Sequence, residues 1–110
     1  MALKDLSIKT MKIFNPADNT ENQQVTNALS DAVRILNARA GNDVRLSKIF
    51  NPSDVQENMD VTNSIASALM NLGATNLPKI SNPSDATENQ QVTNKLVDAV
   101  NQLMQTVGVE

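Results

Sequence analysis

Acidic side chains recur in pairs at one spacing, and they are the residues of this sequence best able to do acid–base or metal chemistry. The pairs are Asp18 with Glu21, Asp54 with Glu57, and Asp85 with Glu88. With Asn19, the first pair offers oxygen ligands for Ca²⁺, but the stretch 15–22 has neither the Asp-x-Asp-x-Asp order nor the Gly of a calcium loop. Aspartate three residues before glutamate is also the spacing of a helix capping box, and we favour that interpretation.

Other catalytic signals are missing from the 110 residues. The sequence has no His and no Cys, which removes the commonest general base, the commonest metal ligand and any thiolate nucleophile. It also has no glycine-rich phosphate loop and no paired nucleophile and base. We therefore predict that the chain is not an enzyme and takes neither a metal nor another cofactor.

The carboxylate pairs belong to a longer motif that occurs three times. The copies occupy 15–27, 51–63 and 82–94; each starts with Asn-Pro, and all three have Val-Thr-Asn at the end. A Lys-Ile pair precedes each copy, at Lys12, Lys48 and Lys79. A motif repeated at such intervals indicates a repeat architecture.

An apolar pattern follows within each copy, at offsets of 0, 4, 7, 8 and 11 residues from its valine. This spacing places the apolar side chains on one face of an α-helix. The three sets are Val25, Leu29, Ala32, Val33 and Leu36; Val61, Ile65, Ala68, Leu69 and Leu72; and Val92, Leu96, Ala99, Val100 and Leu103.

The helix ends can also be located from the sequence. Either Asn-Pro opens each helix directly, or a turn precedes a helix capped by aspartate; we expect the turn, with the first helix beginning near Thr20. Gly41, Gly73 and Gly108 follow the apolar patterns and are expected to be C-terminal caps.

The connections 42–50 and 74–81 are long enough to run back along a helix, which would let successive helices point the same way. We predict a mainly α single domain, 1–110, in which each repeat is an extended segment, an Asn-Pro turn and an amphipathic helix. The predicted parts are an N-terminal arm or strand, 1–11, and repeats at 12–41, 48–73 and 79–108, related by a pseudo-threefold axis. The alternative is a small β/α solenoid with a three-stranded parallel sheet, although Pro78 disfavours a central strand.

One asparagine of each copy shares the apolar face of its helix: Asn22, Asn58 and Asn89. These three either close a hydrogen-bonded ring on the axis, as a buried asparagine in a coiled coil can, or lie half-exposed in the first turn and help capping. The triplet Val-Thr-Asn has poor helix propensity, which indicates specific contacts by its threonines or asparagines. These residues are Thr26, Thr62 and Thr93, and Asn27, Asn63 and Asn94.

Charge and composition argue against two classes of partner. The formal net charge is −3 and the only aromatic residues are Phe14 and Phe50, so the sequence lacks the basic stripe and stacking aromatics of nucleic-acid-binding proteins. No apolar run reaches the length of a transmembrane helix, and residues 1–12 have no hydrophobic region of a secretion signal. We expect neither nucleic acid nor membrane as a partner, and a soluble protein that is intracellular when synthesised.

The third copy resembles the C-terminal segment of the head-fibre proteins of tailed bacteriophages. The matching residues are Glu88-Asn89-Gln90, Thr93, Val97-Asp98, Leu103-Met104 and Gly108, about a quarter of the chain. The family segment is single-copy and richer in alanine, whereas this chain has three copies and no long fibre. The resemblance implies a virion protein, made in the host cytoplasm and fixed to the capsid exterior as a head-fibre-type or decoration protein.

Three similar units in one chain also match a threefold or quasi-threefold arrangement of identical capsid subunits. We therefore expect a monomer that binds capsid protein at such a position. The expected partner-binding residues are Lys12, Lys48, Lys79, Asp18, Asp54 and Asp85. The alternative function is a non-viral interaction module or inhibitor that uses one helical face.

Overall fold

An Asn-Pro turn precedes every helix, and the turn follows from its residues. In the first copy the backbone N–H of Asp18 donates to the carbonyl of Asn15 at 2.9 Å, which closes a four-residue turn with Pro16 in its second position. Equivalent bonds close the other two turns, from Asp54 to Asn51 and from Asp85 to Asn82. The alternative in which Asn-Pro opens the helix directly is wrong, because the helices begin only after each aspartate.

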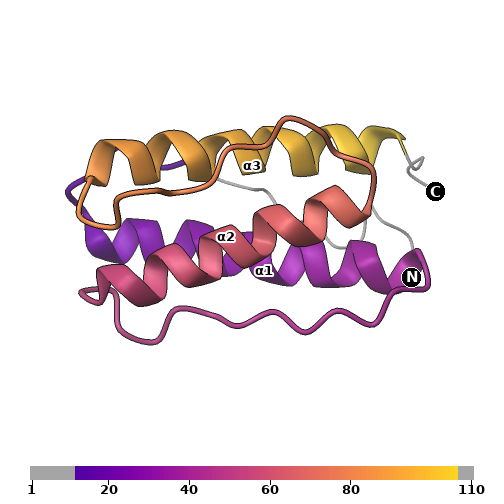
Figure 1. Ribbon diagram of the computed structural model, residues 1–110, viewed down its shortest axis with the longest axis horizontal. Coiled ribbons are helices and arrows are strands. Elements are labelled where there is room, and N and C mark those ends of the chain that lie inside the picture. Colours follow the sequence, from indigo (N-terminus) through magenta and orange to yellow (C-terminus); the bar gives the residue numbers. More distant parts are fainter. Residues whose placement is uncertain (1–11, 107–110) are drawn as a thin grey trace.

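The computed structural model describes residues 12–106, which contain three helices (Figure 1). They are α1 (Asn19–Arg39), α2 (Val55–Asn71) and α3 (Ala86–Thr106). Gly41 and Gly73 follow the first two helices with φ of +87° and +101°, which glycine adopts most readily. Two further backbone bonds, from Asn42 N–H to the Asn37 carbonyl and from Ala74 N–H to the Leu69 carbonyl, complete Schellman caps and confirm these ends. Gly108 lies outside the described residues.

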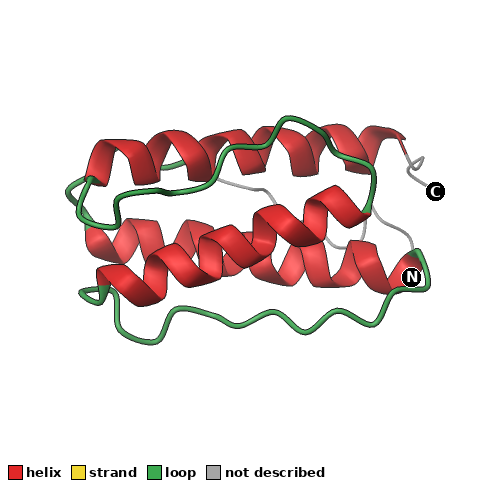
Figure 2. Cartoon of the chain, viewed as in Figure 1, coloured by secondary structure: helices red, strands yellow, loops and turns green. Residues whose placement is uncertain are grey.

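All three helices run in the same direction, with their N-terminal ends together (Figure 1). Long loops return the chain to that end, as Figure 2 shows. The return segment 42–50 runs back along α1: Ser30 Oγ donates to the Ser47 carbonyl at 2.9 Å, and Ile49, two residues later, bonds the earlier residue Asn27. The expectation of parallel helices with extended returns is confirmed.

No residue between 12 and 106 is in a β-strand, so the solenoid with a parallel sheet is wrong. The return segments bond helix side chains and do not lie beside one another, and therefore no sheet forms. The predicted arm or strand at 1–11 lies outside the described residues.

The core lies where the apolar faces of the helices meet, and each helix contacts both others. Leu29, Ile65 and Leu96 occupy the same position in successive copies, and all are 0% exposed. Most other residues of the apolar pattern are also buried, whereas Leu72, Ala99 and Leu103 are half-buried. Each isoleucine that follows the repeated lysine is buried as well: Ile13, Ile49 and Ile80.

Candidate functional site

The paired carboxylates bind backbone N–H groups at the start of each helix. In every copy the aspartate accepts a hydrogen bond at 3.0 Å from the N–H of the glutamate three residues later. The glutamate in turn accepts two N–H groups of the chain before the Asn-Pro turn; Glu21 Oε1 accepts from Phe14 and Asn15, at 3.1 and 2.8 Å. This is an extended capping box, and within residues 12–106 no three acidic side chains gather to hold a metal ion.

The glutamate of the capping box gives a testable prediction. Glu57→Ala removes the acceptor of the Phe50 and Asn51 N–H groups, at 3.1 and 2.9 Å, and should lower the free energy of unfolding by about 0.5–2 kcal/mol. Urea unfolding measures the change. Glu57→Gln keeps a side-chain oxygen and should lose less; an equal loss in both variants would contradict the assigned contacts.

A second contact joins each return segment to a neighbouring helix, and we call it the amide clamp: Asn27, Asn63 and Asn94. Each asparagine bonds both backbone groups of one buried isoleucine, accepting from its N–H at 2.7–2.8 Å and donating to its carbonyl at 3.1 Å. These contacts confirm that the Val-Thr-Asn asparagines make specific contacts.

The amide clamp links the chain in a closed cycle. Asn27 of α1 bonds Ile49 before α2, and Asn63 of α2 bonds Ile80 before α3. Asn94 of α3 then bonds Ile13 before α1, across 81 residues of sequence. Each of the three units therefore makes the same contact with the next, and the last unit makes it with the first.

Two glutamines extend the clamp in two of the three units. Gln23 Nε2 donates to the carbonyls of Ile49 and Phe50 at 3.0 and 3.4 Å. Gln90 Nε2 makes the same pair of bonds to Ile13 and Phe14, at 2.9 and 3.3 Å. The second unit has Met59 at this position, and the methionine side chain has no N–H group to donate to the carbonyl of Ile80 or Ser81.

Asn22, Asn58 and Asn89 are buried, at 5–7% exposed, so the half-exposed capping interpretation is wrong. The aspartate before each helix caps it instead. The side-chain oxygen of each asparagine accepts a hydrogen bond from the threonine four residues later, Thr26, Thr62 or Thr93, at 3.3–3.4 Å. Among the described residues no hydrogen bond joins one of these asparagines to another, so the hydrogen-bonded ring is not formed.

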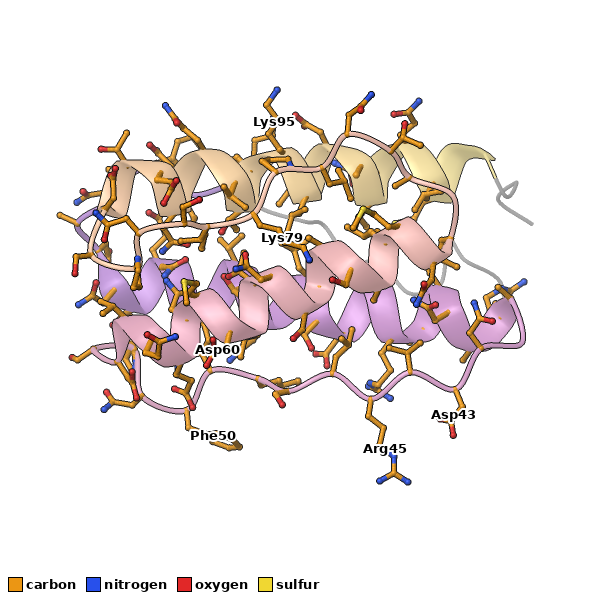
Figure 3. All side chains as sticks on the ribbon, viewed as in Figure 1. Asp43, Arg45, Phe50, Asp60, Lys79 and Lys95 are labelled. Carbon is orange, nitrogen blue, oxygen red and sulfur yellow. The ribbon has the colours of Figure 1, made fainter. Side chains whose placement is uncertain are left out.

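The three repeated lysines lie on the surface and differ in their pairing. Lys12 Nζ is 2.8 Å from Asp98, and Lys48 Nζ is 2.7 Å from Asp31. Ser67 takes the place of that aspartate in the second copy, and within residues 12–106 Lys79 has no ion pair (Figure 3). Lys12 and Lys48 thus form ion pairs along the sides of the bundle. The aspartates of the three copies, Asp18, Asp54 and Asp85, cap the helices at its end.

Sequence reasoning missed the surface exposure of the two phenylalanines. Phe14 and Phe50 are 82% and 84% exposed, and each stands one residue before an Asn-Pro turn. The sequence did contain a signal that sets them apart: they are the only aromatic residues, and they occupy the same position in two repeats. They lie at the same end of the bundle as the capping aspartates.

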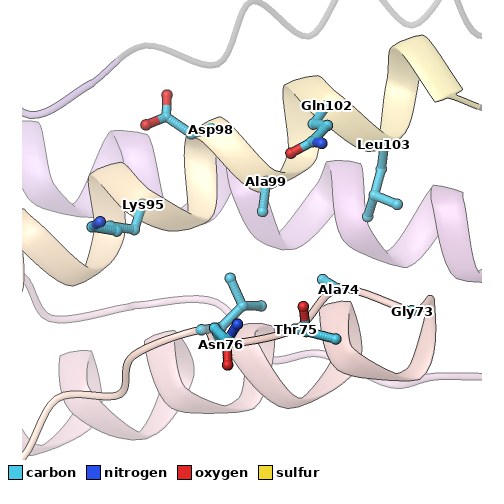
Figure 4. Close-up of a pocket in the computed structure, with 10 residues that line it drawn as sticks. Gly73, Ala74, Thr75, Asn76, Lys95, Asp98, Ala99, Gln102 and Leu103 are labelled. Atoms are coloured by element: carbon cyan, nitrogen blue, oxygen red, sulfur yellow. The ribbon is translucent and has the colours of Figure 1, made fainter.

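A shallow surface pocket of about 410 Å³ opens between the loop after α2 and the middle of α3 (Figure 4). Asn76, Lys95 and Gln102 contribute polar groups to its lining. The carboxylate in this lining, Asp98, already pairs with Lys12. We assign no chemistry to this pocket.

Comparison of this chain with known proteins identifies no relative. The chain matches no protein-family model, no curated protein and no solved structure. In the part of the chain that the structure describes, none of the helices has the length and apolar character needed to cross a lipid bilayer.

Proposed function

We propose that this chain is a structural virion protein that binds the outside of a phage capsid, as a head-fibre-type or decoration protein. The observation that carries the proposal is the cyclic order of the amide clamp, in which three similar units make the same contact with one another. Such a chain presents three similar surfaces around one pseudo-threefold axis. Three identical capsid subunits around a threefold or quasi-threefold position offer a matching set of surfaces.

The same cycle supports a monomer as the functional form. A single repeat would leave its isoleucine N–H and carbonyl without a partner, and an open array would leave one such pair at its end. Here Asn94 binds Ile13, so the contact that would otherwise recruit a second copy is made within the chain. We expect sedimentation of the free protein to give a monomer; a stable trimer would contradict the internal pseudo-threefold arrangement.

Capsid binding is the decisive test of function. Under this proposal the chain is encoded by a tailed bacteriophage, so purified protein is mixed with assembled capsids of that phage, and the particles are sedimented and imaged. We expect the protein to co-sediment, with added density on the outer surface at threefold or quasi-threefold positions. Protein that stays in the supernatant would overturn the proposal and favour a non-viral interaction module.

A further inference from the structure

Phe14 and Phe50 combine high exposure with a fixed backbone. The N–H of each donates to its own capping glutamate at 3.1 Å, so both are attached to the helix that follows. The carbonyl of each accepts from a glutamine of a neighbouring helix, Gln90 or Gln23, at 3.3–3.4 Å. Both backbone polar groups are thus held while the ring stays in solvent, and Figure 3 shows Phe50 pointing away from the bundle.

The glutamine and the phenylalanine occur together. Where the segment before the turn carries phenylalanine, the neighbouring helix carries glutamine: Gln90 faces Phe14, and Gln23 faces Phe50. In the third case the segment carries Ser81 and the neighbouring helix carries Met59, which makes no such bond. The segment before the turn can therefore be held without the glutamine. The glutamine occurs only where that segment carries an exposed phenylalanine.

Exposed aromatic side chains on an ordered backbone have the properties of binding anchors. Aromatic residues supply much of the binding energy at protein interfaces, and a backbone already fixed in the free protein reduces the ordering cost of association. Burial of either ring on folding contributes little to stability, since more than four-fifths of each residue is exposed. The two rings are thus available to a partner.

Charge decides which partner fits this end of the bundle. The three capping boxes place six acidic residues there: Asp18, Glu21, Asp54, Glu57, Asp85 and Glu88. A second copy presenting the same end would bring like charges together, and an anionic lipid surface would be repelled in the same way. A protein surface with basic residues around apolar sockets is complementary.

We propose that Phe14 and Phe50 are the anchors by which this end of the molecule docks into two apolar sockets, rimmed by basic residues, on its protein partner. Taking capsid protein as that partner rests on the function proposed above. The three units then differ in role: two provide anchors, and the unit with Ser81 provides none.

The test replaces both rings with the residue that the third repeat already has. The double variant Phe14→Ser/Phe50→Ser should keep the thermal unfolding temperature of the parent protein, because the rings are exposed, and should bind capsids at least about tenfold more weakly. Met70→Ser is the matched control, since Met70 is 41% exposed near the C-terminal end of α2. The control should bind capsids like the parent.

The glutamines provide a second, graded variant. Gln23→Met/Gln90→Met copies the residue of the second repeat, keeps both rings and frees the two phenylalanine carbonyls. We expect capsid binding to weaken by about two- to tenfold, because the amide clamp still holds each segment but the phenylalanine carbonyl is no longer fixed, so the ring must be positioned on binding. Unchanged binding would show that the glutamines do not position the rings.

Three outcomes separate this inference from the proposed function. Capsid binding by the parent that survives in the double phenylalanine variant would overturn the anchors and leave the proposed function standing. Failure of the parent to bind capsids would overturn both. The free chain is also tested for self-association at high concentration and for binding to anionic vesicles. If either is seen and is lost in the double variant, the rings bind a second copy or a membrane, and the proposal of a basic protein partner is overturned.

Hydroxyl-radical footprinting of the capsid complex supplies a readout that does not depend on variants. Phe14 and Phe50 should lose reactivity when the complex forms, while Met70 should not. Protection of Met70 with both rings still reactive would place the partner at the opposite end and contradict the proposal. Binding should also weaken as salt is added, because the acidic end faces a basic rim.

Discussion

Truncating Leu96 to alanine should lower the free energy of unfolding by about 2–5 kcal/mol, and Leu29→Ala and Ile65→Ala should cost similar amounts. All three side chains are 0% exposed and occupy the same position in successive helices. Removing any of them leaves a cavity between helices that are tied to one another by the amide clamp and cannot freely close. Urea unfolding followed by circular dichroism measures the three values.

Exposed apolar residues provide the control for this series. Val55→Ala and Met70→Ala change side chains that are 44% and 41% exposed, and should alter stability by less than about 0.5 kcal/mol. If the three core variants fell in the same small range, the shared core of the three helices would be refuted.

Asn63→Ala should be the most damaging change in the amide clamp. It leaves both the N–H and the carbonyl of the buried Ile80 without their side-chain partner, and each unsatisfied buried group costs about 1–3 kcal/mol. Asn94→Ala should cost less, because the Ile13 carbonyl keeps its bond from Gln90 at 2.9 Å. The same urea measurement gives both values.

A further variant tests why the two positions differ. Met59→Gln supplies to the second unit the glutamine that the other two have. In the Asn63→Ala background it should recover part of the lost stability, by restoring a donor for the Ile80 carbonyl. Equal losses in Asn63→Ala and Asn94→Ala, with no recovery on adding the glutamine, would contradict the assigned hydrogen bonds.

The helices were predictable from the sequence because their signals are local and repeated. The offsets after Val25, Val61 and Val92 identified the buried faces, and the glycines at 41 and 73 identified two helix ends. The common direction of the helices followed from the length of the return segments. These features depend on short-range periodicity and chain reach, which one sequence contains.

The contacts between units were less accessible to sequence reasoning. Val-Thr-Asn indicated a specific contact, but the partner of Asn27 is the backbone of Ile49, and a backbone group has no signature in the residue type. The burial of Asn22 was not predicted, for a related reason. Its position near the helix start favoured exposure, whereas in the folded chain Asn22 is buried and its side-chain oxygen accepts a hydrogen bond from Thr26.

The exposure of Phe14 and Phe50 could not be derived either. Isoleucine and phenylalanine follow one another before the turn, and sequence alone does not decide which of the two enters the core. The amide clamp decides it: by holding both backbone groups of Ile13 or Ile49, it orients the isoleucine inward and its neighbour outward.

The bond between Ile13 and Asn94 has a consequence for the order in which the chain folds. A partner 81 residues away is reached only after a large loop closes, and such non-local contacts slow folding. During synthesis α1 is complete before α3, whose Asn94 bonds Ile13, has been made. The Asn94 partner of Ile13 is therefore added last, and a chain that ends before α3 would leave both backbone groups of Ile13 without the side chain that bonds them.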